Sequence, residues 1–249
     1  MIDRAGLYGD LIFETIRVRD GKICFPDKHY NRLCRGAQML KFDISTLSED
    51  VFRNEILKAL NGKSDARIRF VLQRDAEGFY TPSSNHTKFS VEVFQLHSIS
   101  KVCHHLGLYT AHKKSCDELS NLKSGNALVS VLAAIFNKEN ELDDCILLNQ
   151  FDRVAEAISS NIFLVKNKSI ITPPLTEGCV DGVMRQVVIE IATQKSIPVM
   201  ETPIKVEDVL DADEIFLTNA IDGIVSAEAF GSQKYSKQFI THLKSILEL

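Results

Sequence analysis

The stretch NLKSGNALVSVLAAIF, residues 121–136, places Lys123 just before a predicted apolar helix. The apolar side chains of that helix recur at the i, i+3, i+4 and i+7 positions of one face, namely Leu128, Val131, Leu132 and Ile135. The spacing predicts that this face is buried. Residues 124–126 supply a cap and a turn. Lys123 is therefore expected where the chain emerges beside a core, and a cation at such a place raises the question of catalysis.

Composition excludes several classes of protein. The chain has 249 residues, 45% hydrophobic and 25% charged, enough for one large domain or two modest ones. Its formal net charge of -4, without a basic run, offers no surface for nucleic acid or for an anionic membrane. The N-terminus has no apolar signal region, and the six cysteines and seven histidines lie at no metal-ligand spacing. We expect a reduced, metal-free, cytoplasmic protein.

Hydrophobic periodicity predicts an α+β fold in both halves of the chain. In the first half we expect a hairpin turning at Asp20-Gly21, helices at 28–40 and 48–60, and strands at 67–74 and 88–96. In the second half we expect the helix after Lys123, strands at 145–149, 214–218 and near 224, a hairpin at 162–171, and helices at 182–194 and from about 235. We place a domain boundary in the polar stretch from His97 to His105, which gives domains of residues 1–100 and 101–249.

Two further segments carry groups suited to chemistry. AEAISSNIF (155–163) sets Glu156 before a Ser-Ser-Asn turn into an apolar strand. The second segment, EGCVDGVMRQ (177–186), opens a helix at Gly182 with two free amides, and such a helix start binds phosphate through its N–H groups and its dipole. Taken singly, each feature has an ordinary structural reading: a surface lysine, a loop carboxylate and the start of a helix.

Taken together and in chain order, these segments resemble the fold type IV pyridoxal-phosphate enzymes. This is the class IV aminotransferase family of branched-chain and D-amino-acid aminotransferases and aminodeoxychorismate lyases. The resemblance spans nearly the whole chain, although family members usually carry a leading strand or two where only Met1 and Ile2 precede the first motif. The motifs are DRAGLYGDLIFETIR (3–17), HYNRL (29–33), LKSGN (122–126), AEAISSNIF (155–163), TPPL (172–175), GVMR (182–185) and FLTNA (216–220).

This resemblance implies a two-domain architecture like that of D-amino-acid aminotransferase. The N-terminal α+β domain would be the smaller one, and the larger C-terminal domain would bind pyridoxal 5'-phosphate. It also implies a homodimer whose active sites lie near the interface, with the partner contributing to each pocket.

The resemblance assigns a role to individual residues. Lys123 would bond covalently to the cofactor aldehyde and then act as the proton-transfer base. Glu156 would bond the pyridine nitrogen and keep it protonated, so that the ring can withdraw electrons. The phosphate would be held by charged and polar groups: Arg32, the amides of Val183 and Met184, and Thr218 with Asn219.

Subgroup features favour a lyase. Branched-chain aminotransferases usually carry a tyrosine where this chain has Ala127, and D-amino-acid aminotransferases carry an R-x-H segment where it reads DAEGFYTP. Thr15 in FETIR, together with GVMRQ and TNA, looks more like aminodeoxychorismate lyases, in which that threonine is implicated in catalysis. We therefore expect conversion of 4-amino-4-deoxychorismate to 4-aminobenzoate and pyruvate, a step in folate precursor synthesis. A class IV aminotransferase for branched-chain or D-amino acids is the alternative, and a cofactor-binding protein without turnover is a third reading.

Candidate substrate residues come from the first half of the chain. The period-two rule puts Phe13, Thr15 and Arg17 on one face of their strand, which we expect to line the pocket. Arg17 could bind a substrate carboxylate, and Arg74 and Tyr80 are second candidates. A buried structural ion pair or a strand-edge position is the alternative for these three residues.

Overall fold

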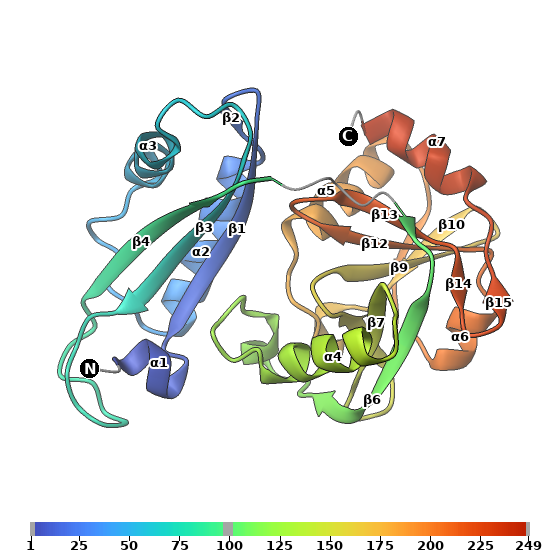
Figure 1. The fold of residues 1–249 in the computed structure, drawn as a ribbon, viewed down its shortest axis with the longest axis horizontal. Helices are drawn as coiled ribbons and strands as arrows, with labels where there is room; N and C mark the ends of the chain where they lie inside the picture. The colour runs from blue at the N-terminus through green and yellow to red at the C-terminus, as the bar shows by residue number, and fades with distance from the viewer. Residues whose placement is uncertain (1–2, 97–101, 248–249) are drawn as a thin grey trace. The chain divides into compact units, whose positions relative to one another are not determined.

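The computed structural model describes residues 3–96 and 102–247. They fall into two compact units (Figure 1): unit 1 comprises Met1–Ser98 and Leu122–Asn126, and unit 2 comprises Ile99–Asn121 and Ala127–Leu249. Residues 97–101 of the predicted domain boundary lie outside the described residues. The short segment that carries Lys123 belongs with unit 1, whereas a single cut near residue 100 would assign it to the second domain.

The described part of unit 1 contains a four-stranded antiparallel sheet in the order β2-β1-β3-β4. Its strands are β1 (Leu11–Arg19), β2 (Lys22–Ile23), β3 (Ala66–Arg74) and β4 (Thr87–Phe94), and its helices are α1 (Arg4–Tyr8), α2 (Pro26–Met39) and α3 (Glu49–Leu60). The β1–β2 turn is the predicted one. Asp20 and Gly21 both have positive φ, 50° and 72°, as a tight two-residue hairpin turn requires.

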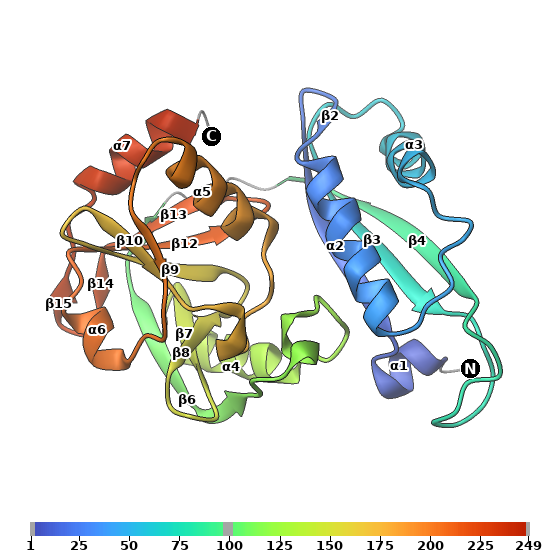
Figure 2. The same ribbon diagram turned by 180° about the vertical axis from the view of Figure 1, so that it is seen from behind.

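Helices α2 and α3 pack on the same face of the unit 1 sheet (Figure 2). Strand β1 alternates strictly, with Ile12, Ile16 and Val18 buried in that core. Glu14 lies on the same buried face. The opposite face of β1 remains partly exposed, and it carries the three residues that the period-two rule grouped together. That grouping is confirmed.

Unit 2 is built on two sheets, which in the described residues have the orders β11-β10-β9-β12-β13-β5 and β15-β14-β6-β7-β8. The strands are β5 (Val102–Cys103), β6 (Leu106–Lys114), β7 (Asp144–Asn149), β8 (Val154–Ala157), β9 (Asn161–Lys166), β10 (Ser169–Thr172), β11 (Val199–Glu201), β12 (Glu214–Asn219), β13 (Gly223–Ala227), β14 (Ala229–Phe230) and β15 (Gln233–Lys234). The helices are η1 (Glu118–Asn121), α4 (Leu128–Glu139), η2 (Leu175–Glu177), α5 (Val183–Gln194), α6 (Val206–Leu210) and α7 (Gln238–Leu247).

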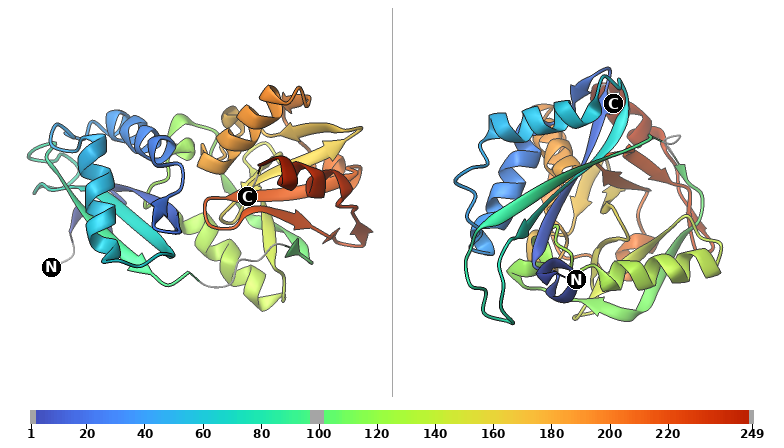
Figure 3. Two further views of the ribbon diagram at one scale, coloured as in Figure 1. Left: turned by 90° about the horizontal axis from the view of Figure 1, so that it is seen from above. Right: turned by 60° about the vertical axis from the view of Figure 1, so that its left-hand side comes forward.

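The strands of unit 2 are apolar on both faces because each sheet has other elements packed against both of its faces. Alternate residues of β9 and β12, such as Leu164 and Ile215, pack toward the core between the two sheets. The residues between them, Phe163 and Phe216, stack with ring centroids 4.7 Å apart in a second core, to which α5 and α7 contribute. Figure 3 shows the ribbon of this unit from two further directions. Helix α4 covers the outer face of the other sheet. This layering explains the continuous apolar runs that predicted these strands.

The predicted burial of the helix that follows Lys123 is wrong in the single chain. Leu128, Val131, Leu132 and Ile135 are 74%, 51%, 40% and 50% exposed. Helix α4 instead packs on its sheet through other side chains, with Ala133 fully buried. The spacing located an apolar face correctly, but α4 has apolar residues on two sides. Periodicity alone does not say which side faces the core.

No helix within residues 3–96 and 102–247 combines the length and the apolar character that crossing a membrane requires.

Candidate functional site

Backbone pairing ties Lys123 to strand β1 in unit 1. The N–H of Phe13 donates to the carbonyl of Lys123 at 2.9 Å, and Ser124 forms an antiparallel bridge with Ile12. The segment thereby occupies the edge of β1 that the short strand β2 leaves open. The Lys123 Nζ lies 4.7 Å from the centroid of the Phe13 ring. The structure therefore brings together two predicted site residues that are far apart in sequence.

The open face of β1 presents Phe13, Thr15 and Arg17 in succession. Alternate residues of a strand are separated by about 7 Å, so Thr15 lies one step along the strand from the ring that contacts Lys123. All three side chains are partly exposed. This face can present a hydroxyl and a guanidinium to a small molecule.

Arg32 lies in a buried charge cluster with Glu14 and His29. Its Nε donates to Glu14 Oε1 at 2.8 Å, its Nη2 binds Glu14 Oε2, and His29 Nδ1 lies 2.6 Å from the same Oε2. Burial by itself would raise the pKa of Glu14, but the positive charge of Arg32 and hydrogen bonds from His29 and Arg32 lower that pKa to about 2. Burial lowers the pKa of His29, so its neutral ring donates from Nδ1.

Glu14 and His29 were missed by the sequence analysis. Both stand inside motifs that were used, FETIR and HYNRL, but strand parity assigned Glu14 to the core face, where a carboxylate has no evident partner. The structure supplies that partner from α2, and the cluster fixes the guanidinium of Arg32 in place.

Arg74 and Tyr80 are placed differently from each other. Arg74 is 8% exposed and donates to Asp10 Oδ2 at 2.9 Å and to the carbonyl of Leu40 at 2.8 Å, which is the structural alternative considered for it. Tyr80 is 87% exposed on the β3–β4 loop. Arg4 anchors that loop by donating to its carbonyl groups. Tyr80 can thus meet another molecule, whereas Arg74 shapes unit 1.

Glu156 is held by two donors in unit 2. It lies on β8, is 6% exposed, and accepts a hydrogen bond from the Val180 N–H to Oε2 at 2.8 Å. Lys114, which the sequence analysis did not single out, forms an ion pair with Oε1. These two contacts leave acceptor positions on the carboxylate oxygens for a further donor.

The start of α5 retains the geometry of an anion site. Its N-cap is Gly182, and no described side chain caps the helix. A Cβ on Gly182 would lie 1.9 Å from Asn161 Oδ1, so only glycine fits at this position. The amides of Val183 and Met184 belong to the first turn, where N–H groups have no partner inside the helix. The predicted pair of amides is therefore available for binding.

Thr218 and Asn219 divide their roles at the end of β12. Thr218 is 1% exposed, and its Oγ1 has no hydrogen-bond partner among the described residues. Asn219 uses both donors of its amide group, one to Ser160 Oγ at 3.2 Å and one to Asp222 Oδ2 at 3.0 Å. Asn219 therefore shapes the loop, while Thr218 carries a buried hydroxyl that requires a partner.

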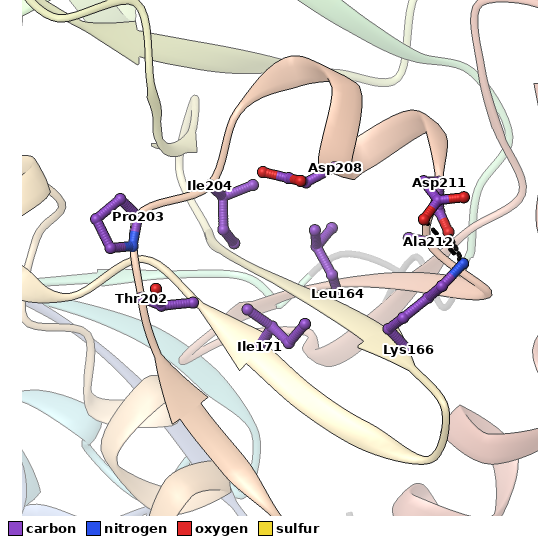
Figure 4. Close-up of a pocket in the computed structure, with 9 residues that line it drawn as sticks. All are labelled: Leu164, Lys166, Ile171, Thr202, Pro203, Ile204, Asp208, Asp211 and Ala212. Carbon is purple, nitrogen blue, oxygen red and sulfur yellow. Dashed lines mark hydrogen bonds and ion pairs between the residues drawn. The ribbon is translucent and has the colours of Figure 1, made fainter.

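A pocket elsewhere in unit 2 contains none of the predicted site residues. It has a volume of about 180 Å³ and lies beside α6 (Figure 4), lined by Leu164, Lys166, Ile171, Thr202, Pro203, Ile204, Asp208, Asp211 and Ala212. Its one lysine is paired with Asp211 at 3.1 Å and with Asp213 at 3.6 Å. This pocket has no group that the proposed chemistry uses.

Comparison with known proteins identifies the family. Residues 11–230 match the family described as amino-transferase class IV, and the chain belongs to that family. A putative branched-chain-amino-acid aminotransferase from Methanocaldococcus jannaschii is 32% identical over 231 residues, which is 90% of this chain and 80% of that protein. An aminodeoxychorismate lyase from Bacillus subtilis is 28% identical over 243 residues, which is 95% of this chain and 83% of that protein.

A crystal structure of a putative 4-amino-4-deoxychorismate lyase from Legionella pneumophila matches the fold with a TM-score of 0.92 at 25% identity, covering 100% of this chain and 93% of that one. The expected mixed α/β fold of type IV is confirmed. The chain is a pyridoxal-phosphate-dependent enzyme of this family.

The residues present fit that cofactor. A phosphate ester requires clustered donors, and unit 2 offers uncapped helix amides and the unpartnered hydroxyl of Thr218. A protonated pyridine nitrogen requires a carboxylate, and Glu156 is one that is already held in place.

The unpartnered hydroxyl gives a direct test. Thr218→Val removes a group that has no protein partner, so the free energy of unfolding without cofactor should not fall. The Kd for pyridoxal phosphate should rise about tenfold, as expected for losing one hydrogen bond to an anion. Thr172→Val is the matched control, because its buried hydroxyl donates to the Ile162 carbonyl at 2.8 Å. That variant should lose about 1 kcal/mol of stability and keep its cofactor affinity.

The Glu14 cluster predicts a pH dependence of stability. The pKa of Glu14 is about 2 in the folded chain and 4.5 ordinarily, so its contribution is complete above pH 4.5 and is lost as pH falls toward 2. That difference corresponds to about 3 kcal/mol. Protonation of His29 in the unfolded chain should already lower stability as pH falls below 6.5. Denaturant titrations should show a shallower loss between pH 5 and pH 2 for Glu14→Gln than for the wild type, whereas Glu139→Gln at an exposed position should follow the wild type.

Proposed function

We propose that the chain is an aminodeoxychorismate lyase that converts 4-amino-4-deoxychorismate to 4-aminobenzoate and pyruvate. The observation that carries this proposal is the position of Thr15. Its side chain shares the open face of β1 with Phe13, whose ring contacts the Lys123 ammonium. A hydroxyl on the same strand face as the ring that contacts the lysine can bond the substrate or relay a proton. Ala127, which offers no phenol at the position that branched-chain aminotransferases fill with tyrosine, supports the same assignment.

Several residues of the chain carry groups suited to holding the cofactor. Arg32 supplies a guanidinium for the phosphate, and the first amides of α5 and the Thr218 hydroxyl supply neutral donors. Asn219 keeps the loop of Thr218 in shape. When bound, pyridoxal phosphate supplies an aldehyde that captures an amine and a ring that withdraws electrons from the neighbouring carbon.

The protein residues would then control protons. Glu156 would accept a hydrogen bond from the cofactor's protonated ring nitrogen. Lys123, once its amine is free, would take the proton from the substrate carbon that bears the amino group, and a proton would return to the departing three-carbon unit as pyruvate leaves. Thr15 bonds or relays at this step, and Arg17 on the same face binds a substrate carboxylate. Product formation needs no second keto acid.

The reaction itself is the first test. Purified protein should form equimolar 4-aminobenzoate and pyruvate from aminodeoxychorismate without a keto-acid acceptor. Thr15→Val keeps the β-branched shape and removes the hydroxyl, so kcat should fall by about 100-fold while cofactor content stays unchanged. Thr15→Ser, which restores a hydroxyl, should recover most of that loss.

A class IV aminotransferase is the competing function, because relatives from Methanocaldococcus jannaschii and Thermotoga maritima at 32% and 30% identity are named as putative and probable branched-chain-amino-acid aminotransferases. Steady conversion of an amino acid to its keto acid, dependent on 2-oxoglutarate or pyruvate and indifferent to Thr15→Val, would establish that alternative and refute the lyase.

We also propose that the chain acts as a homodimer, as its family resemblance implies. Helix α4 supplies a candidate contact surface, because its exposed stripe of four large apolar residues contains no charge: Leu128, Val131, Leu132 and Ile135. A stripe of this kind is stable in water when a second copy covers it.

Substitutions on this stripe test the assembly. Val131→Glu together with Ile135→Glu should convert a dimer into a monomer in sedimentation at micromolar concentration, because two carboxylates would have to be buried. Lys138→Glu, a charge change at the exposed end of the same helix, should leave the mass unchanged. A monomeric wild-type protein with full activity would contradict the proposal.

A further inference from the structure

A buried ion pair in unit 2 is not explained by the assignments above. Lys114 is the last residue of β6, and its side chain is 13% exposed, against 7% for Glu156. Its Nζ binds Glu156 Oε1, while the Val180 N–H binds Oε2. Removing two charges from water is costly, and such pairs add little stability over apolar residues of similar size. The arrangement therefore suggests a purpose other than stability.

The neighbouring lysine shows that the placement is specific. Lys113 pairs with Asp152 at 2.7 Å, and the Asp152 side chain is 78% exposed. Successive residues of a strand point to opposite sides, so of two adjacent lysines one meets a surface carboxylate and the other enters the interior. Of the two lysines, Lys114 is the one that contacts Glu156, whose charge also acts on the neighbouring acid Asp144.

Both of these contacts of Glu156 come from donors, the Lys114 ammonium on Oε1 and the Val180 N–H on Oε2. An ionised carboxylate accepts from both and has no hydrogen of its own to place. Each carboxylate oxygen has two acceptor positions, so Glu156 can bind both donors and still accept a third.

We propose that Lys114 is a positioning residue for Glu156: it keeps this carboxylate ionised and fixes its orientation, so that it receives the cofactor's ring nitrogen in the protonated form. The inference rests on the proposed contact of Glu156 with that nitrogen. Lys114 acts through Glu156 and requires no contact with the cofactor. Without Lys114, the buried carboxylate loses one of the two cations that it faces, so the proton between Glu156 and the ring nitrogen shifts toward the carboxylate oxygen. A neutral carboxyl donates a hydrogen bond to an unprotonated ring nitrogen instead of accepting one.

This change should be visible in the absorbance of the bound cofactor. A protonated ring withdraws electrons and makes the nitrogen that joins Lys123 to the cofactor less basic. Loss of the ring proton makes that nitrogen more basic, and removal of the nearby Lys114 charge acts in the same direction. The absorbance of the bound cofactor at about 400 to 430 nm changes with pH. The midpoint of that change should therefore lie at a higher pH in Lys114→Met.

The experiment compares three variants with the cofactor bound. Lys114→Met should raise the pH midpoint by about one pH unit, a tenfold change in the proton affinity. Lys114→Arg keeps the charge and should stay within about 0.3 pH unit of the wild type, as should Lys113→Met, the matched loss of the adjacent lysine. An unchanged or lowered midpoint in Lys114→Met, or an equal rise in Lys113→Met, would overturn the proposal.

A second readout covers loss of folding. If Lys114→Met melts at a lower temperature without cofactor, Glu156→Gln in the same chain should restore the melting temperature, because the unpaired buried charge is then removed. A double variant that is no more stable than Lys114→Met would contradict the pairing on which the inference depends.

Glu156→Gln alone separates this inference from the proposed function. In a separate portion of the same preparation, borohydride should fix the cofactor on Lys123, which establishes that the site is loaded. If Glu156→Gln leaves the midpoint unchanged in loaded protein, the assignment of Glu156 to the ring nitrogen fails. A midpoint that responds to Glu156→Gln and not to Lys114→Met would refute the role of Lys114 alone.

Discussion

The pairing of residues 122–126 with strand β1 is the constraint on which the candidate site depends. Two short backbone contacts, Phe13 to Lys123 and Ser124 to Ile12, hold a loop against a strand more than a hundred residues earlier in the chain. They set Lys123 over the Phe13 ring and on the face that carries Thr15. Because backbone pairing fixes the register, a shift of one residue would turn that face toward the core and separate the lysine from the hydroxyl.

Buried carboxylates recur in both units, and each has a defined set of donors. Glu14 is bound by Arg32 and His29, and Glu156 by Lys114 and the Val180 amide. Each carboxylate forms an ion pair with a cation, because a buried charge is costly without such a partner. Arg32 and Glu156 are both residues proposed to contact the cofactor, so each cluster would also orient a group for binding.

Much of the fold was predictable because local signals agreed with it. The Asp20-Gly21 turn, helix α3 and strands β7, β9 and β12 appear where the sequence places them. Strand β6 was missed, since LGLYTAHKK neither alternates cleanly nor forms a continuous apolar run. The orientation of α4 was also missed, because this helix has apolar residues on two sides. Contacts with neighbouring elements, and not the spacing of its own residues, then determine which side is buried.

The sequence by itself determined the family and the identity of the groups that can do chemistry, because a lysine, a carboxylate or a helix amide can be recognised from its motif and local spacing. Only the tertiary structure decided their partners. It bound Arg32 to Glu14, committed the Asn219 amide to its own loop and brought Lys114 to Glu156. It also left the Thr218 hydroxyl without a partner among the residues that the structure describes. These contacts join residues from different strands and helices, and the packing that brings such elements together leaves no local pattern in the sequence.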